Sequence, residues 1–150
     1  MVCWADFEAA SPELAALGRD RIEQPGFALL GTIRRDGTPR ISPVEPRFVE
    51  GELALNILGD SLKVRDIDRD SRIALHSAVL RSDDPADEFN LRGRAIEATD
   101  PGLCETVADL TWHPPPPSRI FVVDVESAAF VAWSKGERTV TSWSADRGRG

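Results

Sequence analysis

Two basic side chains stand near the start of an expected helix, where backbone electrostatics disfavour cations. The segment SLKVRDIDR (61–69) follows an apolar run, and either Asp60 or Ser61 fits the N-cap position. Lys63 and Arg65 follow in the next turn. A helix N-terminus carries about half a positive charge, so each cation there costs roughly 0.3–1 kcal/mol unless an anion neutralises it. The segment therefore predicts a bound phosphate.

The alternative for this segment is a solvated surface helix with no ligand. In that interpretation Lys63 and Arg65 pair with Asp66 and Asp68 further along the same helix. Both interpretations use the same residues, so the segment alone does not separate them. The elements around it must decide.

Composition limits the class of protein. The 150 residues suit one domain with one core, spanning 1–150. The net charge of −7 argues against an extended nucleic-acid surface, although not against a local basic patch. Cys3 and Cys104 lack metal-ligand spacing, and no apolar stretch resembles a signal peptide or a membrane span. These features predict a cytoplasmic protein with no metal, nucleic-acid or membrane partner.

Strand patterns fill most of the chain after an N-terminal helix over about 11–24, and the barrel that they predict covers about 27–144. Tight turns are expected at Asp36-Gly37, Glu50-Gly51 and Lys135-Gly136. The strand patterns lie at 27–34, 38–49, 52–58, 72–80, 89–99, 119–125, 128–134 and 137–144. Short helices are expected at 61–69 and 103–110.

Two strand patterns contain residues that disturb a regular ladder. The pattern at 38–49 includes Pro39, Pro43 and Pro46, which cannot donate to a ladder, so this segment should be an edge, a bulge or a bend. Gly93 in the pattern at 89–99 indicates a bulge or a close approach of another backbone. Counted as six or seven barrel strands, joined mostly by hairpins and interrupted by three short helices, these segments predict a mainly β protein. We expect a closed antiparallel barrel rather than a βαβ layout.

The order of these signals over about residues 27–144 resembles the pyridoxamine 5'-phosphate oxidase-like flavoproteins, which have a split β-barrel. In that family an arginine and the apolar backbone after it lie along flavin mononucleotide (FMN), and the match here is Arg40-Ile41-Ser42-Pro43-Val44. A strand and a helix start bearing Ser-x-Lys lie against the ribityl phosphate, and Asn56-Ile57 and Ser61-Leu62-Lys63 match that segment. The resemblance therefore implies an FMN-binding split barrel.

The resemblance also implies which residues hold the ligands. A guanidinium, an ammonium and a hydroxyl suit a dianionic phosphate, which assigns Arg40, Lys63 and Ser61 to it. Trp133 and Arg138 resemble an aromatic and an arginine near the substrate. The full implied cofactor set is Arg40, Ile41, Ser42, Pro43, Val44, Asn56, Ile57, Ser61, Leu62 and Lys63. Trp112, Trp133 and Trp143 are candidate pocket walls, with core or interface positions as the alternative.

Three departures from the family pattern limit the activity that the resemblance implies. Leu62 stands where vitamin-metabolising members carry a second basic residue, and residues 88–90 lack the glutamine that reaches the flavin from the partner subunit. The histidine and arginine that grip pyridoxal phosphate are missing from the C-terminal segment. True pyridoxamine phosphate oxidation is therefore not expected. The chain looks more like the branch that uses FMN or a deazaflavin to reduce small molecules.

These inferences together predict an FMN-dependent oxidoreductase that transfers hydride between the flavin and a small organic substrate. No catalytic side chain is expected, because the redox chemistry belongs to the cofactor. The resemblance implies a homodimer with the cofactor at its interface. One alternative is a deazaflavin-dependent reductase, whose longer phosphorylated tail would need Arg65 or Arg69. The other is a flavin-binding or haem-binding protein without turnover.

Overall fold

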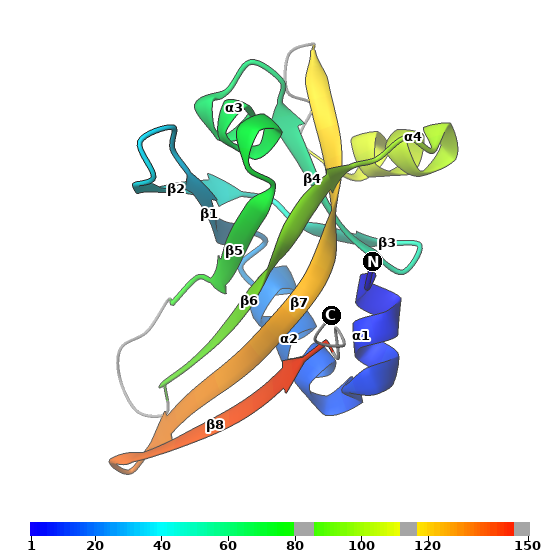
Figure 1. Ribbon diagram of the computed structural model, residues 1–150. Coiled ribbons are helices and arrows are strands. Elements are labelled where there is room, and N and C mark those ends of the chain that lie inside the picture. Colours follow the sequence, from blue (N-terminus) through cyan, green and yellow to red (C-terminus); the bar gives the residue numbers. More distant parts are fainter. Residues whose placement is uncertain (80–85, 112–116, 146–150) are drawn as a thin grey trace.

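An antiparallel sheet with helices at its margins forms the body of the protein in the computed structural model, which describes residues 1–79, 86–111 and 117–145 (Figure 1). The helices are α1 (Trp4–Ala10), α2 (Pro12–Glu23), α3 (Leu62–Arg69) and α4 (Pro101–Leu110). The strands are β1 (Ala28–Ile33), β2 (Pro39–Val44), β3 (Arg47–Val49), β4 (Glu52–Leu58), β5 (Arg72–Ser77), β6 (Ala86–Glu97), β7 (Ser118–Ser134) and β8 (Glu137–Ser144). Within these described ranges, no helix has both the length and the apolar character that a membrane crossing requires.

The strands follow the order β2-β1-β5-β6-β7-β4-β3. β7 is long enough to serve two further strands, since its first residues pair with β4 and its last eight with β8. Among the described residues no ladder joins the end strands β2 and β3, so the sheet curls without closing. The predicted mainly β, split-barrel fold is confirmed, whereas the expectation of a closed ring of strands is wrong.

The predicted turns are confirmed by backbone geometry. Gly37, Gly51 and Gly136 have positive φ, and so do the residues before the last two, Glu50 and Lys135. Two strand boundaries differ from the prediction. The segment 38–49 is divided into β2 and β3 at Glu45-Pro46, which is the bend that its prolines predict. The segments 119–125 and 128–134 are a single strand, because residues 126–127 contain no glycine or proline to interrupt it.

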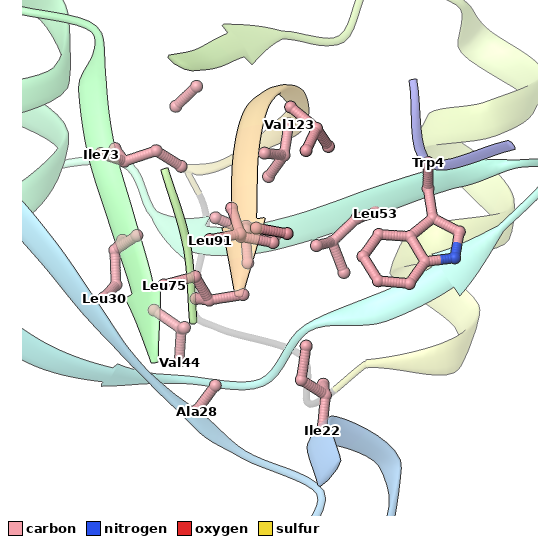
Figure 2. Packing of buried hydrophobic residues seen from close by; sticks show 14 of the residues in the cluster. Trp4, Ile22, Ala28, Leu30, Val44, Leu53, Ile73, Leu75, Leu91 and Val123 are labelled. Atoms are coloured by element: carbon pink, nitrogen blue, oxygen red, sulfur yellow. The ribbon is translucent and has the colours of Figure 1, made fainter. Parts of the chain in front are cut away.

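The core lies inside the curl of the sheet and extends to the N-terminal helices. Figure 2 shows Leu30, Leu75, Leu91 and Val123 from neighbouring strands gathered in the interior, and these side chains are at most 1% exposed. α1 is a helix that the sequence analysis missed. It buries Trp4, whose ring lies 4.7 Å from that of Phe48 in β3. The core therefore ties the first ten residues to the barrel.

Two aromatic contacts show what α1 adds. Phe7 is fully buried and its ring lies 5.0 Å from that of Trp4 and 4.9 Å from that of Trp143 in β8. Trp143 therefore packs against α1, and it also lines a small hollow with residues of β6, β7 and β8. Apolar residues at positions 4 and 7 fit one face of a helix, but a helix of seven residues carries little periodic signal.

Glu52, the first residue of β4, gives a pH-dependent prediction for this region. Its Oε2 is buried without a hydrogen-bond partner in the described structure, and burial, followed by the charge of Asp6, raises the pKa of Glu52. Because the pKa is higher in the folded state than in the unfolded state, the protonated carboxyl favours folding. This contribution to the free energy of unfolding is lost as the pH rises through the folded-state pKa. Glu52→Gln should therefore increase the melting temperature at pH 7.

Thermal unfolding at pH 7 and at pH 4 tests this prediction. The gain should shrink at pH 4, where the wild-type carboxyl is largely protonated. Glu137→Gln, at an exposed position of β8, is the matched control and should leave the melting temperature unchanged at both pH values. A Glu52→Gln variant that is less stable than the wild type at pH 7 would contradict the argument.

Candidate functional site

A pocket of about 510 Å³ opens between β2, β4 and the first turn of α3. We call it the α3 pocket. Its volume lies within the range of roughly 300–1,000 Å³ that small-molecule sites occupy. Six residues expected from the sequence to bind cofactor line it, namely Pro43, Val44, Asn56, Ile57, Ser61 and Lys63. Phe27, Glu45, Leu58 and Thr111 complete the lining.

A close backbone approach places the start of α3 beside this pocket. β4 ends at Leu58, and Gly59 follows with its N–H donating to the carbonyl of Pro117 at 2.8 Å. A Cβ on Gly59 would lie only 2.8 Å from that carbonyl oxygen, so glycine permits the approach. Ser61 is then the N-cap of α3, which is one of the two positions that the sequence left open, although its side chain makes no capping hydrogen bond.

Two buried oxygen atoms in the α3 pocket lack a hydrogen-bond partner among the described residues. Asn56 donates through Nδ2 to Thr111 Oγ1 at 2.9 Å, which leaves its Oδ1 unpaired. Ser61 Oγ is unpaired in the same way. Nearly all buried polar atoms in folded proteins are hydrogen-bonded, so these two are equipped to meet a ligand. Together they offer an acceptor and a hydroxyl that can donate or accept.

Lys63 brings a positive charge to the same pocket. No carboxylate of the described residues lies within 4.0 Å of its ammonium group. Glu45 also lines the pocket, but its carboxylate faces Arg47 at 4.0 Å. The first turn of α3 adds backbone N–H groups, which favour anions. This arrangement suits a ligand with an anionic end and an apolar body.

Arg40 lines a different hollow, on the other side of the α3 start. This hollow, which we call the arginine cleft, has a volume of about 910 Å³. It is lined by Arg34, Arg35, Arg40, Arg65 and Arg69, together with Leu62, Asp36, Asp66 and Asp68. Residues 62, 65, 66 and 69 repeat at helical spacing and share one face of α3, whereas Lys63 lies on another. Within this chain the structure does not bring Arg40 and Lys63 into one hollow.

Asp66 holds Arg40 in the arginine cleft. Its buried carboxylate accepts hydrogen bonds from Arg40 Nε at 2.6 Å, Thr32 Oγ1 at 2.8 Å and Arg69 at 3.1 Å. Burial raises the pKa of Asp66, but the hydrogen bonds from Arg40, Thr32 and Arg69 outweigh it and hold the pKa below the ordinary value of an aspartate. Arg69 also donates to the carbonyl of Ile33 at 2.6 Å. Asp66 therefore fixes α3 against β1 and β2.

Asp66→Asn should lower the free energy of unfolding by roughly 2–3 kcal/mol at pH 7, because it removes a carboxylate that accepts charged hydrogen bonds. A lowered pKa stabilises the fold above the unfolded-state pKa, and this contribution is lost as the pH falls through the folded-state pKa. The difference in the free energy of unfolding between Asp66→Asn and the wild type should thus be largest at pH 7 and smaller at pH 3. Urea unfolding at both pH values measures it.

Asp109→Asn, at an exposed position near the end of α4, is the control for the loss of a carboxylate and should change stability by less than about 0.5 kcal/mol. Equal stability of Asp66→Asn and the wild type at pH 7 would show that the network does not hold α3.

The pairing expected for a solvated helix does not occur. Asp66 is bound to Arg40 and Arg69, and Asp68 pairs with Arg119 of β7 at 2.8 Å. Lys63 and Arg65, the partners assigned in that alternative, make no ion pair with them. Asp66 and Asp68 therefore do not neutralise the charges of Lys63 and Arg65, as the alternative of a solvated helix requires.

The other residues expected at the site have different positions. Ile41 is 71% exposed on β2, and neither it nor Ser42 lines the α3 pocket. β2 is an end strand, so one edge of its backbone is open in the described structure, and Pro43 fits there because it has no N–H to donate. Trp133 and Arg138 face each other across the β7–β8 hairpin. Neither residue lines the α3 pocket of its own chain, and Figure 1 shows the β7–β8 hairpin turn at the opposite end of the view from α3.

Sequence reasoning missed four lining residues of the α3 pocket, Phe27, Glu45, Leu58 and Thr111. The first three lie in or beside predicted strands, but no pattern indicated that they face a ligand site. Thr111 follows α4 and meets Asn56 across 55 positions of sequence, which only the fold reveals. Trp112, also considered as a pocket wall, lies outside the described residues.

Comparisons with known proteins agree on the architecture. The family described as pyridoxamine 5'-phosphate oxidase matches residues 15–132. No curated protein gives a significant match. Among solved structures, the protein Atu2129 of Agrobacterium tumefaciens, described as of unknown function, has a TM-score of 0.65 at 20% identity. The match covers 82% of this chain and 58% of that one.

Two further structures have different described roles. A heme binding protein from Mycobacterium smegmatis has a TM-score of 0.62 at 18% identity, with 84% of this chain and 57% of that chain covered. A protein described as F420 reductase has a TM-score of 0.57 at 22% identity, covering 73% of this chain and 94% of the other. This chain thus spans less than two thirds of the Agrobacterium and Mycobacterium proteins. At these identities the likeness shows the fold alone.

Proposed function

The chain belongs to the pyridoxamine 5'-phosphate oxidase family, and from this premise we propose that it is a cytoplasmic oxidoreductase that binds FMN in the α3 pocket. The family resemblance inferred from the sequence is confirmed by the match over residues 15–132. The observation that carries the proposal is the pair of buried atoms Asn56 Oδ1 and Ser61 Oγ, which have no hydrogen-bond partner among the described residues and lie in the pocket that Lys63 also lines.

The lining of the pocket fits the chemical parts of FMN. A phosphate would be held by Lys63, the hydroxyl of Ser61 and the first N–H groups of α3, which combine an ammonium with neutral donors. Asn56 Oδ1 suits a hydroxyl or N–H donor of the ligand. Val44, Ile57 and other apolar residues form the wall for an aromatic ring system. Arg40 is a further candidate for the phosphate, because its hydrogen bond to Asp66 uses Nε and the described residues accept none from Nη1 or Nη2.

FMN, when bound, would supply hydride transfer to or from a small organic substrate. The residues of this chain would bind and orient the cofactor, and the apolar wall at Val44 and Ile57 would keep water from one side of the ring. The proposed hydride transfer does not require an acid or a base from the pocket, because the redox chemistry belongs to the cofactor. The substrate would approach the ring from the side that these residues leave open.

We propose that two copies of the chain form a homodimer at the β1–β2 surface. Phe27 and Leu29 are 38% and 37% exposed, and with Ile41 they leave an apolar surface next to the α3 pocket. In the β1–β2 register, Leu29 lies opposite Pro43 and Gly31 lies opposite Ile41, so Leu29 and Ile41 share one face of the two strands. Isologous packing of two such surfaces would bury it and enclose the pocket. Trp133 and Arg138 would then serve the pocket of the partner.

An absorption spectrum of freshly purified protein, followed by reduction under anaerobic conditions, tests the proposed activity. The protein as purified or reconstituted with FMN should show flavin bands, and a reduced nicotinamide should bleach them. Reoxidation by a panel of small conjugated substrates would then identify the acceptor. A protein that binds FMN but is neither reduced nor reoxidised across the panel would be a binding protein rather than an oxidoreductase.

A deazaflavin is the second candidate cofactor, favoured by one observation. Arg65 lines the arginine cleft beside the start of α3, where a longer phosphorylated tail would need a cation. Parallel titrations of the protein with FMN, a deazaflavin coenzyme and haem would rank the three ligands. Tighter binding of the deazaflavin than of FMN would replace the cofactor in the proposal while keeping the pocket.

A further inference from the structure

The lining of the α3 pocket contains two charged side chains of opposite sign. Lys63 belongs to the first turn of α3, whereas Glu45 belongs to the bend between β2 and β3. The other lining residues are apolar or carry neutral polar groups. No ion pair joins Lys63 to Glu45 in the described part of the chain, so their charged groups lie more than 4.0 Å apart. The pocket therefore offers a positive group and a negative group that do not neutralise each other.

Glu45 is only weakly neutralised by its own chain. Among the described residues, the cation within 4.0 Å of its carboxylate is Arg47, which lies outside the pocket and approaches only to that distance. The Arg47 guanidinium is committed to two backbone carbonyls, since Nη1 donates to Pro46 at 2.9 Å and Nε donates to Leu110 at 3.2 Å. The Glu45 side chain is 51% exposed, and exposed pairs contribute little. The Glu45 carboxylate is thus available to a ligand.

The cofactor of the proposed function leaves Glu45 without a complementary charge. FMN carries negative charge on its phosphate and no positive charge, so it complements Lys63 but not Glu45. Bound FMN would add repulsion, because its phosphate and the Glu45 carboxylate have the same sign. A cationic group beside Glu45 would relieve this repulsion and would donate a charge-assisted hydrogen bond to the carboxylate. The charges of the pocket therefore favour a cation as the second ligand.

We propose that Glu45 selects the substrate, which is a small organic cation such as a protonated amine with an aromatic or conjugated body. This inference rests on the proposed function, because it concerns the molecule that meets the bound flavin. Pro43 and Val44 precede Glu45 and line the same pocket, so they supply contacts for the apolar body of such a substrate. Glu45 determines specificity and takes no part in the hydride transfer.

Titration of the FMN-loaded protein with three probes of similar shape tests this inference. At pH 7 benzylamine is a cation, benzyl alcohol is neutral and benzoate is an anion. Changes in the flavin absorption spectrum report binding of each probe and do not require turnover. Benzylamine should bind at least about tenfold more tightly than benzyl alcohol, and benzoate should bind most weakly. Added salt should reduce the preference for benzylamine.

Glu45→Gln keeps the shape of the side chain and removes its charge. This variant should bind benzylamine and benzyl alcohol within about threefold of each other, and it should bind FMN at least as tightly as the wild type does. Glu105→Gln, in α4 and outside the pocket, is the matched control and should keep the wild-type preference. Because both glutamates are exposed, both variants should keep the wild-type melting temperature.

The failure of this inference is distinguishable from the failure of the proposed function. If FMN does not bind, both fail. If FMN binds but the wild type binds benzylamine and benzyl alcohol equally, only the choice of substrate is wrong. A loss of FMN affinity in Glu45→Gln with an unchanged preference for benzylamine would show that Glu45 contacts the cofactor instead. A preference that appears only in Arg138→Ala would show that Arg138 of a second copy neutralises Glu45, which also overturns the inference.

Discussion

Gly93→Ala should cost about 3 kcal/mol of stability or more, and the protein should be largely unfolded if its total stability is small. The β6–β7 register shifts between Arg92 and Gly93, which is the bulge that the sequence predicts. A Cβ at position 93 would overlap the backbone carbonyl oxygen of Asp124 and lie 3.0 Å from its carbonyl carbon. Because the overlapping atom belongs to the backbone of β7, it cannot be relieved by a side-chain rotation, and the ladder itself must move.

Urea unfolding monitored by circular dichroism measures this effect. Gly31→Ala is the matched control, since it makes the same change inside a strand of the same sheet. A Cβ there would lie 3.5 Å from the Cβ of Ala74, which is an ordinary contact, and the expected change is within about 1 kcal/mol. If Gly93→Ala is no less stable than Gly31→Ala, the close approach of β6 and β7 is not as the structure describes it.

Lys63→Ala should weaken FMN binding by roughly ten- to hundredfold, because a hydrogen bond to a charged group contributes about 1.5–3 kcal/mol. Combining it with Ser61→Ala should weaken binding further, as a second phosphate donor is lost. Neither side chain takes part in the core, so both variants should fold like the wild type. Fluorescence titration of FMN measures the dissociation constants. Lys63→Arg keeps the charge and should retain most of the affinity.

Arg40→Ala decides whether Arg40 shares the phosphate with Lys63. If Asp66 holds Arg40 in the arginine cleft, its removal should lower stability and leave FMN affinity within about threefold of the wild type. A loss of FMN affinity as large as that of Lys63→Ala would instead show that the two cations act on one anion. In either case the melting temperature separates an effect on folding from an effect on binding.

Local patterns in the sequence were sufficient for most of the fold. The turns at Glu50-Gly51 and Lys135-Gly136 depend on positive φ, and the bend after β2 depends on proline. Single residues are therefore enough to predict these features. α1 was missed because its stability comes from the contacts of Trp4 and Phe7 with distant strands. The gap between β2 and β3 was missed because closure depends on the curl of the whole sheet.

The site was predictable from one continuous segment and, through the family resemblance, from Pro43 and Val44 of β2. Asn56, Ser61 and Lys63 lie within one strand–turn–helix segment, and the structure places all three in the α3 pocket. Arg40 belongs to another strand, and the orientation of its side chain is fixed by a hydrogen bond to the buried Asp66. No local sequence pattern predicts this role of Asp66. Helical spacing alone places Lys63 on a different face of α3 from Leu62 and Arg65. This spacing could therefore have predicted that Lys63 and Arg65 line two different hollows.

Titration of the wild-type protein with FMN and with riboflavin, which lacks the phosphate, tests the central claim most directly. If the start of α3 holds the phosphate of a flavin, FMN should bind at least about tenfold more tightly than riboflavin, and Lys63→Ala should remove most of that difference. Equal affinity of the wild type for the two flavins, or no binding of either, would contradict the account.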